Sequence, residues 1–371
     1  MVKVKGLEFS LREFSGSLGD FGPINPFILG YIVVLRLNPT SIFLAMGITN
    51  IALGLIYRLP LPVEPKKAIA TAALSERWKP QYVYISGLIT GIVWLILSLS
   101  GLVDLLARIT PTPVIRGVQF GLALILIRES LNSIVADIPL ALSCIALIAI
   151  LSKFRIVPSA LAVFCLGVIL ALRSSIADGR LEFSTGFQPP TIYLPSISDI
   201  TFRIATVVFS QILLTFSNAI LATHLAIKEK FPENRLREKD LALNMGALNI
   251  FSSLIGGAPM CHGAGGFASQ YFFGARTGGA MVMEGIFELV LALLFAKPLI
   301  GIFAEYPLAV VGVMILFASI ELCKPVVDLR GFELIFVVSV GLISMLYDLA
   351  IGYLFGLAVF YISRGITHKK A

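Results

Sequence analysis

The stretch from residue 258 to residue 279 reads Ala258-Pro-Met-Cys-His-Gly-Ala-Gly-Gly-Phe-Ala-Ser-Gln-Tyr-Phe-Phe-Gly-Ala-Arg-Thr-Gly-Gly279, and it interrupts a hydrophobic region. Pro259 and four glycines break what would otherwise be a membrane helix, and residues 267–273 are expected to form a short helix after the break. Such a helix leaves backbone N–H groups unpaired at its N-terminus, with the positive end of the helix dipole behind them. That arrangement suits an anion, although a glycine-rich packing surface would give the same pattern.

The composition places this interruption inside a membrane protein. The chain has 371 residues, of which 57% are hydrophobic and 14% charged, and its mean hydropathy is +0.92. Soluble domains carry about 25% charged residues. We therefore predict an all-α polytopic membrane protein with about 14 transmembrane segments. The net charge of +7 then reports orientation in the lipid bilayer rather than nucleic-acid binding.

A second interruption lies near the N-terminus. Residues 58–67 read Arg58-Leu-Pro-Leu-Pro-Val-Glu-Pro-Lys-Lys67, with three prolines in six positions. Prolines at this density cannot lie inside a helix, so the chain is expected to be extended here and to restart as a short helix over residues 66–74. Glu64, Lys66 and Lys67 would lie beside the free N–H groups of its first turn.

Two further segments carry polar residues at membrane depth. Asp20 and Asn25 lie in or beside the first span, whose apolar part is residues 27–35. Polar residues within membranes are often functional, although Asp20 could equally cap a helix at the interface. The eighth span, residues 202–226, has Gln211, Thr215 and Asn218 at positions i, i+4 and i+7, so they share one face. That face must look inward, either toward a ligand or toward hydrogen bonds between helices.

An internal repeat relates the two interruptions. Residues 47–60 and 246–259 are identical at six of fourteen positions with a constant offset of 199, and each runs directly into one of the broken segments. Corresponding interrupted helices in two halves indicate a transporter binding site. We predict two inverted seven-span repeats, residues 1–172 and 200–371, joined by an extracytoplasmic connection at residues 173–199. Spans 3 and 10 would be half-helices whose N-termini face each other near the midplane.

The site predicted between them offers neutral donors, which suit a small tetrahedral oxyanion and still permit its release. Adjacent Cys261 and His262 alone do not make a metal site, so neither a metal nor another cofactor is expected. The substrate-binding candidates are Asn25, Val63, Glu64, Lys66, Lys67, Gln211, Thr215, Ser217, Asn218, Cys261, His262, Gly263, Ala264, Gly265 and Gly266. The candidates for proton coupling are Asp20, Glu64, His262 and Glu284, with Asp348 as a further one.

The interruption around Pro259 also resembles a known signature. The run from Pro259 to Gly266, followed by Gln270-Tyr271 and by Phe273-Gly-Ala-Arg276, is similar to that of the molybdate transporter family, relatives of the SulP sulfate permeases that lack a STAS domain. The first-span sequence Gly19-Asp-Phe-Gly22 and the proline-rich run ending at Lys67 resemble the family as well. So does the pattern of polar residues on the eighth span.

The resemblance implies the fourteen-span fold of sulfate and nucleobase permeases. A core domain would hold spans 1–4 and 8–11, a gate domain spans 5–7 and 12–14, and the anion would lie between spans 3 and 10. Elevator-like movement of core against gate would carry it, and SulP relatives imply a homodimer. No STAS domain is expected after the last span. One departure is Glu64-Pro65, where a Gln-Pro pair is expected; an acidic residue there indicates proton symport or an altered substrate charge.

We therefore predict a secondary active transporter of an oxyanion. Molybdate is the favoured substrate, and sulfate or tungstate is the alternative. A nucleobase permease, a membrane-embedded enzyme and a channel are the more distant alternatives, and no enzyme activity is expected. The distribution of lysine and arginine predicts a multi-pass protein of the cell membrane with both termini in the cytoplasm. The coupling ion and the direction of transport stay open at this point.

Overall fold

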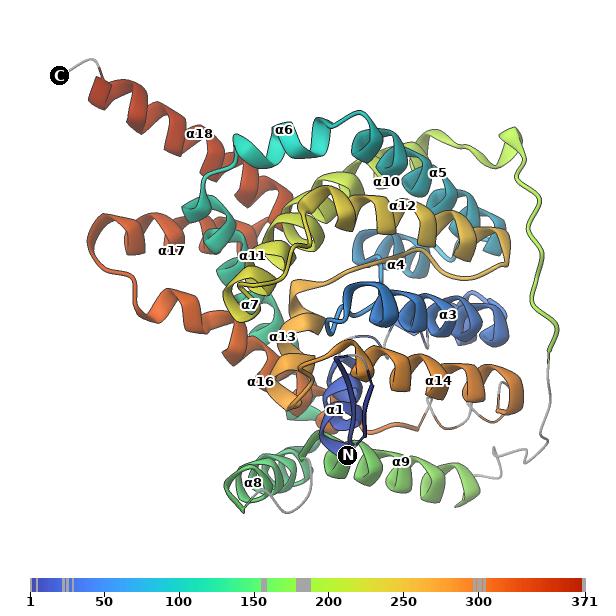
Figure 1. Ribbon diagram of the computed structural model, residues 1–371. Helices are drawn as coiled ribbons and strands as arrows, with labels where there is room; N and C mark the ends of the chain where they lie inside the picture. Colours follow the sequence, from blue (N-terminus) through green and yellow to red (C-terminus); the bar gives the residue numbers. More distant parts are fainter. Residues whose placement is uncertain are drawn as a thin grey trace.

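The structure is a computed structural model that describes residues 2–4, 6–21, 24, 27–28, 30–154, 159–177, 188–295, 298, 302 and 305–368. Helices make up most of it (Figure 1), and the only sheets in the described part are two pairs of very short strands. Asn25 lies outside the described residues.

The first strand pair is a correction to the all-helical prediction. Strand β1 (Val2–Val4) runs antiparallel to β2 (Leu7–Phe9). Gly6 supports the turn because its φ of +85° is readily adopted only by glycine. Helix α1 (Leu11–Ser17) follows, with the Ser10 hydroxyl accepting the Glu13 N–H as its cap. The first helix therefore begins only after this hairpin.

The remaining elements form two series in chain order. The first comprises the 3-10 turn η1 (Leu18–Asp20), the π-helical turn η2 (Gly30–Val34), α3 (Pro39–Tyr57), β3 (Glu64–Pro65), α4 (Lys67–Ser75), α5 (Pro80–Leu99), α6 (Leu102–Arg108), α7 (Thr112–Ile134), η3 (Val135–Asp137), α8 (Ile138–Phe154) and α9 (Ser159–Ala177). The second comprises η4 (Ile197–Asp199), α10 (Phe202–Leu214), the π-helical turn η5 (Thr215–Ala222), α11 (Thr223–Lys230), α12 (Glu238–Leu254), β4 (Met260–Cys261), α13 (Ala264–Phe273), α14 (Gly278–Leu294), α16 (Leu308–Val327), α17 (Gly331–Leu346) and α18 (Leu349–His368).

By length and composition, six helical segments of the described chain can cross a membrane. The count rises to seven if α13 and α14, which meet at an angle of 102°, form one broken span. Gly274, with φ +124°, ends α13, and the Glu13 carboxylate accepts the N–H groups of Arg276 and Thr277 at the bend. The prediction of 14 spans goes beyond this count and stays a prediction.

Glycines allow the long helices of the two series to cross closely. Helix α3 packs against α14, and α12 packs against α5, as Figure 1 shows. A side chain at Gly47 would lie 2.8 Å from the Gly285 carbonyl, and one at Gly91 would lie 3.0 Å from the Gly246 carbonyl. Small residues let membrane helices approach in this way. Gly47 and Gly246 are matching positions of the sequence repeat. Close helix packing therefore explains why both positions are glycine.

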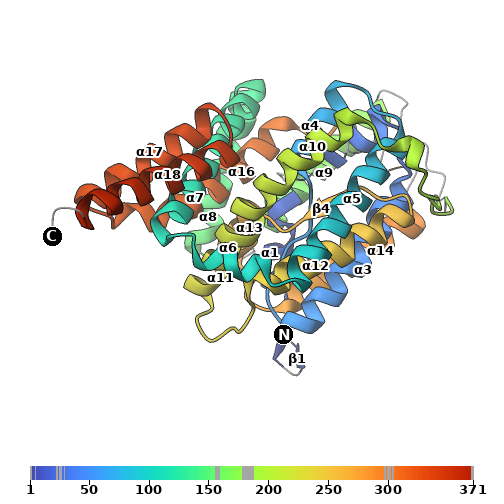
Figure 2. The same cartoon turned by 90° about the horizontal axis from the view of Figure 1, so that it is seen from above.

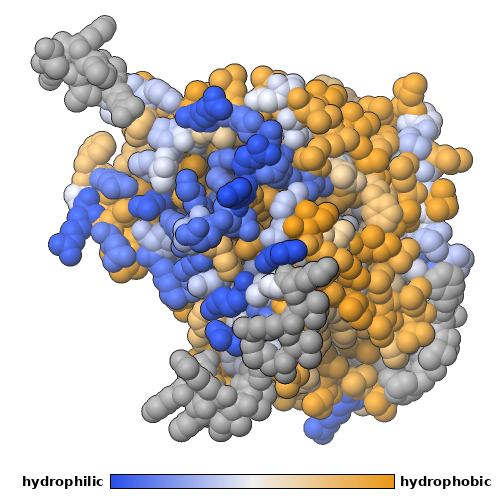
Figure 3. All heavy atoms as spheres, in the orientation of Figure 1, coloured by the Kyte–Doolittle hydropathy of each residue, from blue (hydrophilic) through white to orange (hydrophobic). Residues whose placement is uncertain are grey.

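A second group of helices lies beside these four. Helix α7 packs on α16 and α17, and Figure 2 shows this group and α18 on one side, with α3, α5, α12 and α14 on the other. Large apolar side chains remain exposed on α5 and α14, among them Ile92, Ile96 and Leu293. Figure 3 shows hydrophobic residues over α5 and α14, whereas hydrophilic residues gather over α11. Exposed apolar surface of this extent is typical of contact with lipid.

Candidate functional site

The two sequence interruptions meet in space. Strand β3 pairs antiparallel with β4, so that Glu64 lies opposite Cys261, and the Lys66 N–H donates to the Pro259 carbonyl at 2.8 Å. Helix α4 starts directly after β3, and α13 starts three residues after β4. The predicted start of α13 at residue 267 was wrong, because Ala264, Gly265 and Gly266 are already helical. The N-termini of both short helices therefore flank one strand pair.

A cavity of about 540 Å³ opens beside this strand pair. One wall carries polar groups of β3, β4, α4, α10 and η5, whereas the opposite wall, from α7 and α16, is largely apolar. Arg128, Glu129 and Asp348 also line the cavity. The polar wall is formed by Glu64, Lys67, Thr71, Gln211, Thr215, Asn218 and Cys261. Six of these are residues singled out from the sequence, and Thr71 is an addition.

Gln211 holds the start of α4. Its Oε1 accepts the Ala68 N–H at 2.9 Å and the Ile69 N–H at 3.3 Å, and its Nε2 donates to the Thr215 hydroxyl at 2.9 Å. The sequence led us to expect free N–H groups at this turn. In the structure a side-chain amide takes two of them, because an inward-facing glutamine lies within reach of an uncapped helix start.

The start of α13 is different. The N–H groups of Ala264, Gly265 and Gly266 donate to none of the residues that the structure describes. A Cβ at Gly265 would lie 3.2 Å from Leu126 Cδ1 of α7, so this glycine faces the apolar wall. The positive end of α13 therefore has no hydrogen-bonded acceptor within the described chain, an arrangement that suits an anion.

The remaining candidates lie away from the cavity. Lys66 is fully buried, and its ammonium has no hydrogen-bond partner within the described chain, while the adjacent Lys67 lines the cavity. His262 is buried with Nδ1 3.0 Å from the Pro62 carbonyl, and Val63 is buried. The Ser217 hydroxyl donates to carbonyls of its own helix. Adjacent residues that were predicted together as candidates, such as Lys66 and Lys67, therefore differ in whether they line the cavity.

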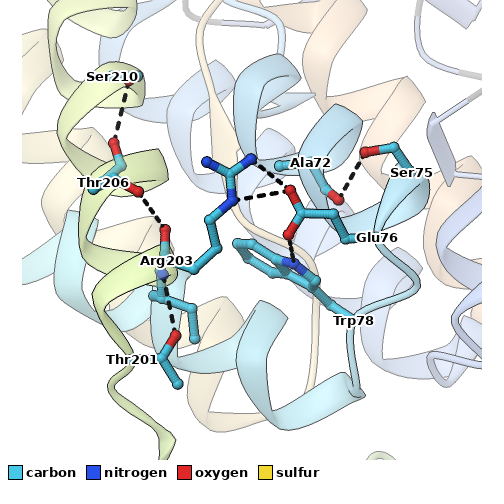
Figure 4. Close-up of polar contacts among 9 residues, drawn as sticks. Ala72, Ser75, Glu76, Trp78, Thr201, Arg203, Thr206 and Ser210 are labelled. Carbon is cyan, nitrogen blue, oxygen red and sulfur yellow. Dashed lines mark hydrogen bonds and ion pairs between the residues drawn. The ribbon is translucent and has the colours of Figure 1, made fainter.

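The far end of α4 is also tied to α10. Figure 4 shows the Arg203 guanidinium on the Glu76 carboxylate, with Nε to Oε1 at 2.9 Å, and the Trp78 indole donating to the same carboxylate. The hydrogen bonds from Arg203 lower the pKa of the Glu76 carboxyl. Since Gln211 binds the opposite end, α4 and α10 run antiparallel and are joined at both ends.

A cluster of buried carboxyl groups lies behind α13. The Gln270 amide donates to Asp20 at 3.0 Å and to Glu284 at 2.9 Å, and Asn50 donates to Glu288 at 2.8 Å. All five side chains are fully buried. Glu288 was missed from the sequence, although its position four residues after Glu284 in an apolar helix was a signal.

Charged pairs join α11 to α7 and α16 at the opposite end of α7 from Arg128. Arg116 lies 3.7 Å from Glu229 of α11, and Lys230 of α11 lies 2.8 Å from Glu321 of α16. Gln119 of α7 also donates to the Ala222 carbonyl at 2.8 Å. Helix α11 and the end of η5 are thus linked to α7 and α16 at one end of α7, whereas the cavity separates α7 and α16 from β3, β4, α4 and α10 toward the other end.

Solved membrane transporters share this architecture. The transmembrane domain of the cyanobacterial bicarbonate transporter BicA matches with a TM-score of 0.61 at 17% identity, over 92% of this chain and 96% of that one. Murine Solute Carrier 26 family member A9, an anion transporter in the inward-facing state, matches with a TM-score of 0.63 at 15% identity, over 99% and 70%. The chain therefore has the fold of these multi-pass membrane proteins.

The family is defined by sequence. The model of the family described as "Molybdate transporter of MFS superfamily" matches residues 12–126 and 203–322. Molybdate transporter 1 of Arabidopsis thaliana is 30% identical, over 93% of this chain and 86% of that protein, and Molybdate transporter 2 of the same plant is 28% identical, over 88% and 81%. The chain belongs to the molybdate transporter family, whose members are transporters and not enzymes.

Proposed function

We propose that this protein is a secondary active transporter of a tetrahedral oxyanion. Molybdate is the favoured substrate, and tungstate and sulfate are the alternatives. The observation that carries the proposal is the cavity with one polar wall, whose apolar wall is reached at Leu126 by the first turn of α13. The polar wall presents the hydroxyl of Thr215, the amide of Asn218 and the ammonium of Lys67, and the unpaired N–H groups of α13 begin directly after β4, which also lines the cavity. Helix N-termini and neutral donors bind oxyanions, and the molybdate transporters among the relatives favour molybdate.

The arrangement supports alternating access. We assign α3–α5 and α10–α14, with the N-terminal elements, to a core domain that holds α4 and α13 as half-helices, and α6–α9 and α16–α18 to a gate domain. The anion would then lie between the two half-helices and face the apolar wall of α7 and α16. Because charged pairs close the end near Glu229 while the other end is open, the structure suits a carrier better than a continuous channel.

Orientation follows from the positive loops. Lys228, Lys230 and the following arginines lie at the closed end, which we assign to the cytoplasm together with both termini. The cavity would then open outward. Elevator-like movement of core against gate would expose the anion to the cytoplasm, with residues 1–172 and 200–371 as inverted repeats. The homodimer implied by the resemblance remains a prediction.

Proton coupling is assigned to the buried carboxyl groups. Asp20, Glu284 and Glu288 have no lysine, arginine or histidine within 4.0 Å among the described residues. Because an unpaired buried carboxylate is costly, these groups hold protons in this state. Gln270 of α13 donates to two of them, Asp20 and Glu284, and the first turn of the same helix would face the anion. Proton release from this cluster is therefore coupled to movement of the half-helix.

Uptake into proteoliposomes tests the function. We expect saturable uptake of radiolabelled molybdate that is blocked by excess unlabelled molybdate and is faster when the outside is more acidic than the inside. Block by sulfate to the same degree would broaden the substrate to oxyanions in general. Absence of uptake, combined with uracil binding by the purified protein, would contradict the proposal and favour a nucleobase permease.

Asn218 and Gln211 are expected to differ when mutated. Asn218→Ala should weaken molybdate binding about tenfold or more, since a hydrogen bond to a charged group contributes about 1.5–3 kcal/mol, and leave the melting temperature nearly unchanged. Gln211→Ala should also lower stability by about 1 kcal/mol because two helix N–H groups lose their acceptor.

Gln211→Glu separates the two roles of this residue. Its carboxylate still accepts the N–H groups of α4, so the melting temperature should be kept, but its charge should repel the anion and reduce affinity at least as far as Gln211→Ala does. Isothermal titration with molybdate and thermal unfolding measure both quantities. Unchanged affinity in all three variants would remove the eighth span from the site.

A further inference from the structure

Glu64 occupies the position at which an anion would meet α13. A Cβ at Gly263 would lie 2.4 Å from its Oε2, and a Cβ at Gly266 would lie 1.9 Å from its Oε1. These glycines are the N-cap residue and the third residue of α13. The carboxylate therefore lies against the first turn of the helix, and these two glycines make the space for it.

The Glu64 carboxylate is only partly compensated. It is 2% exposed, and Oε1 has no hydrogen-bond partner within the described chain. Oε2 lies 3.9 Å from the Lys67 ammonium, and the positive end of α13 lies on the other side. A carboxylate held by a helix dipole and one ammonium, with an oxygen still unsatisfied, is positioned as a bound oxyanion would be, but it belongs to the chain itself.

We infer that the Glu64 carboxylate is a tethered anion that occupies the start of α13 in the absence of substrate and competes with the transported oxyanion. The inference rests on the proposed function and extends it. Two negative charges cannot share this turn without strong repulsion. The substrate therefore binds after the Glu64 carboxylate has rotated away from α13 toward Lys67, and a Gln-Pro pair at this position would lack the competition.

The other charged and titratable groups around Glu64 do not reproduce its role. Lys67 lies beside it on α4, Cys261 lies opposite it on β4, and His262 follows with its ring bound to the Pro62 carbonyl. Asp20 of η1 is near enough for its charge to be felt. The remaining charged groups that line the cavity are Arg128, Glu129 and Asp348. None of these carboxylates lies against Gly263 or Gly266.

Binding of molybdate and tungstate to the purified full-length protein tests the inference. Glu64→Gln keeps the size of the side chain and removes its charge, and we expect it to bind either oxyanion at least about tenfold more tightly than wild type. Glu129→Gln removes the same charge from elsewhere in the cavity wall and should change affinity much less.

The outcomes are distinct. If the wild-type protein binds the oxyanion and a folded Glu64→Gln protein binds it with equal or weaker affinity, the inference is overturned. The proposed function would still stand. An equal gain in Glu129→Gln would also overturn it, because a general change of cavity charge would then suffice. Should Glu64→Gln fail to fold, Glu64→Asp, whose shorter carboxylate withdraws from Gly266, is expected to bind more tightly than wild type, and unchanged affinity there would count against the inference. Absence of oxyanion binding in every folded variant and in wild type would contradict the proposed function itself.

Discussion

Replacing Gly265 with leucine is expected to abolish oxyanion uptake, to the level of liposomes without protein, while the protein still folds. A Cβ at this position lies 3.2 Å from Leu126 Cδ1 and 4.0 Å from Leu122 Cδ2 of α7, so the new side chain extends between α13 and the apolar wall. Leu126 has to shift by a few tenths of an ångström to admit the new Cβ, and the helix interior accepts leucine readily. The leucine would nevertheless cover the N–H groups at the start of α13.

Uptake and binding are measured together with thermal unfolding. Ala149→Leu is the matched control, because Ala149 is exposed on α8 and gains the same side chain away from the cavity. It should transport as wild type does. Normal uptake by Gly265→Leu would show that the anion does not approach this turn of α13, and the half-helix site would have to be abandoned.

The backbone of the site follows from local sequence. Three prolines before Lys66 and the run from Pro259 to Gly266 predict extended breaks followed by short helices, because proline and glycine act on the chain locally. The structure has these breaks, with α4 at residues 67–75 and α13 at residues 264–273. Asn249, which matches Asn50 in the sequence repeat, also has a local role. It exchanges hydrogen bonds with the backbone of Met260 and so anchors β4.

The directions of the side chains do not follow in the same way. Lys66 and Lys67 are adjacent, yet only Lys67 lines the cavity, because the phase of α4 is set by its packing on α10. Gln211 caps α4 across 143 residues of chain, a distance over which no local pattern acts. Glu64 lies on α13 because β3 and β4 pair, and this pairing was not part of the predicted fold.

Replacing Glu284 with glutamine is expected to abolish proton-driven accumulation of the oxyanion while leaving exchange of bound for free anion intact. Glu284 and Asp20 accept hydrogen bonds from the same Gln270 nitrogen, at 2.9 and 3.0 Å, in a fully buried cluster. Glutamine has nearly the same volume and can still accept this hydrogen bond through its carbonyl oxygen, so stability should change by no more than about 1 kcal/mol. Under the proposed coupling, what it loses is the ability to take up and release a proton during transport.

Two assays on the same proteoliposomes separate the possibilities. The first follows uptake driven by a pH gradient and should fall to the equilibrium level in Glu284→Gln. The second follows counterflow of labelled against unlabelled molybdate without a gradient, and it should proceed as in wild type. Glu233→Gln, at an exposed position of the loop after α11, is the control for both. If gradient-driven uptake survives, the proton passes elsewhere, and Glu64 becomes the next candidate. If counterflow is lost as well, Glu284 supports the structure of the half-helix rather than the coupling, because a group that only carries the proton is not needed for exchange.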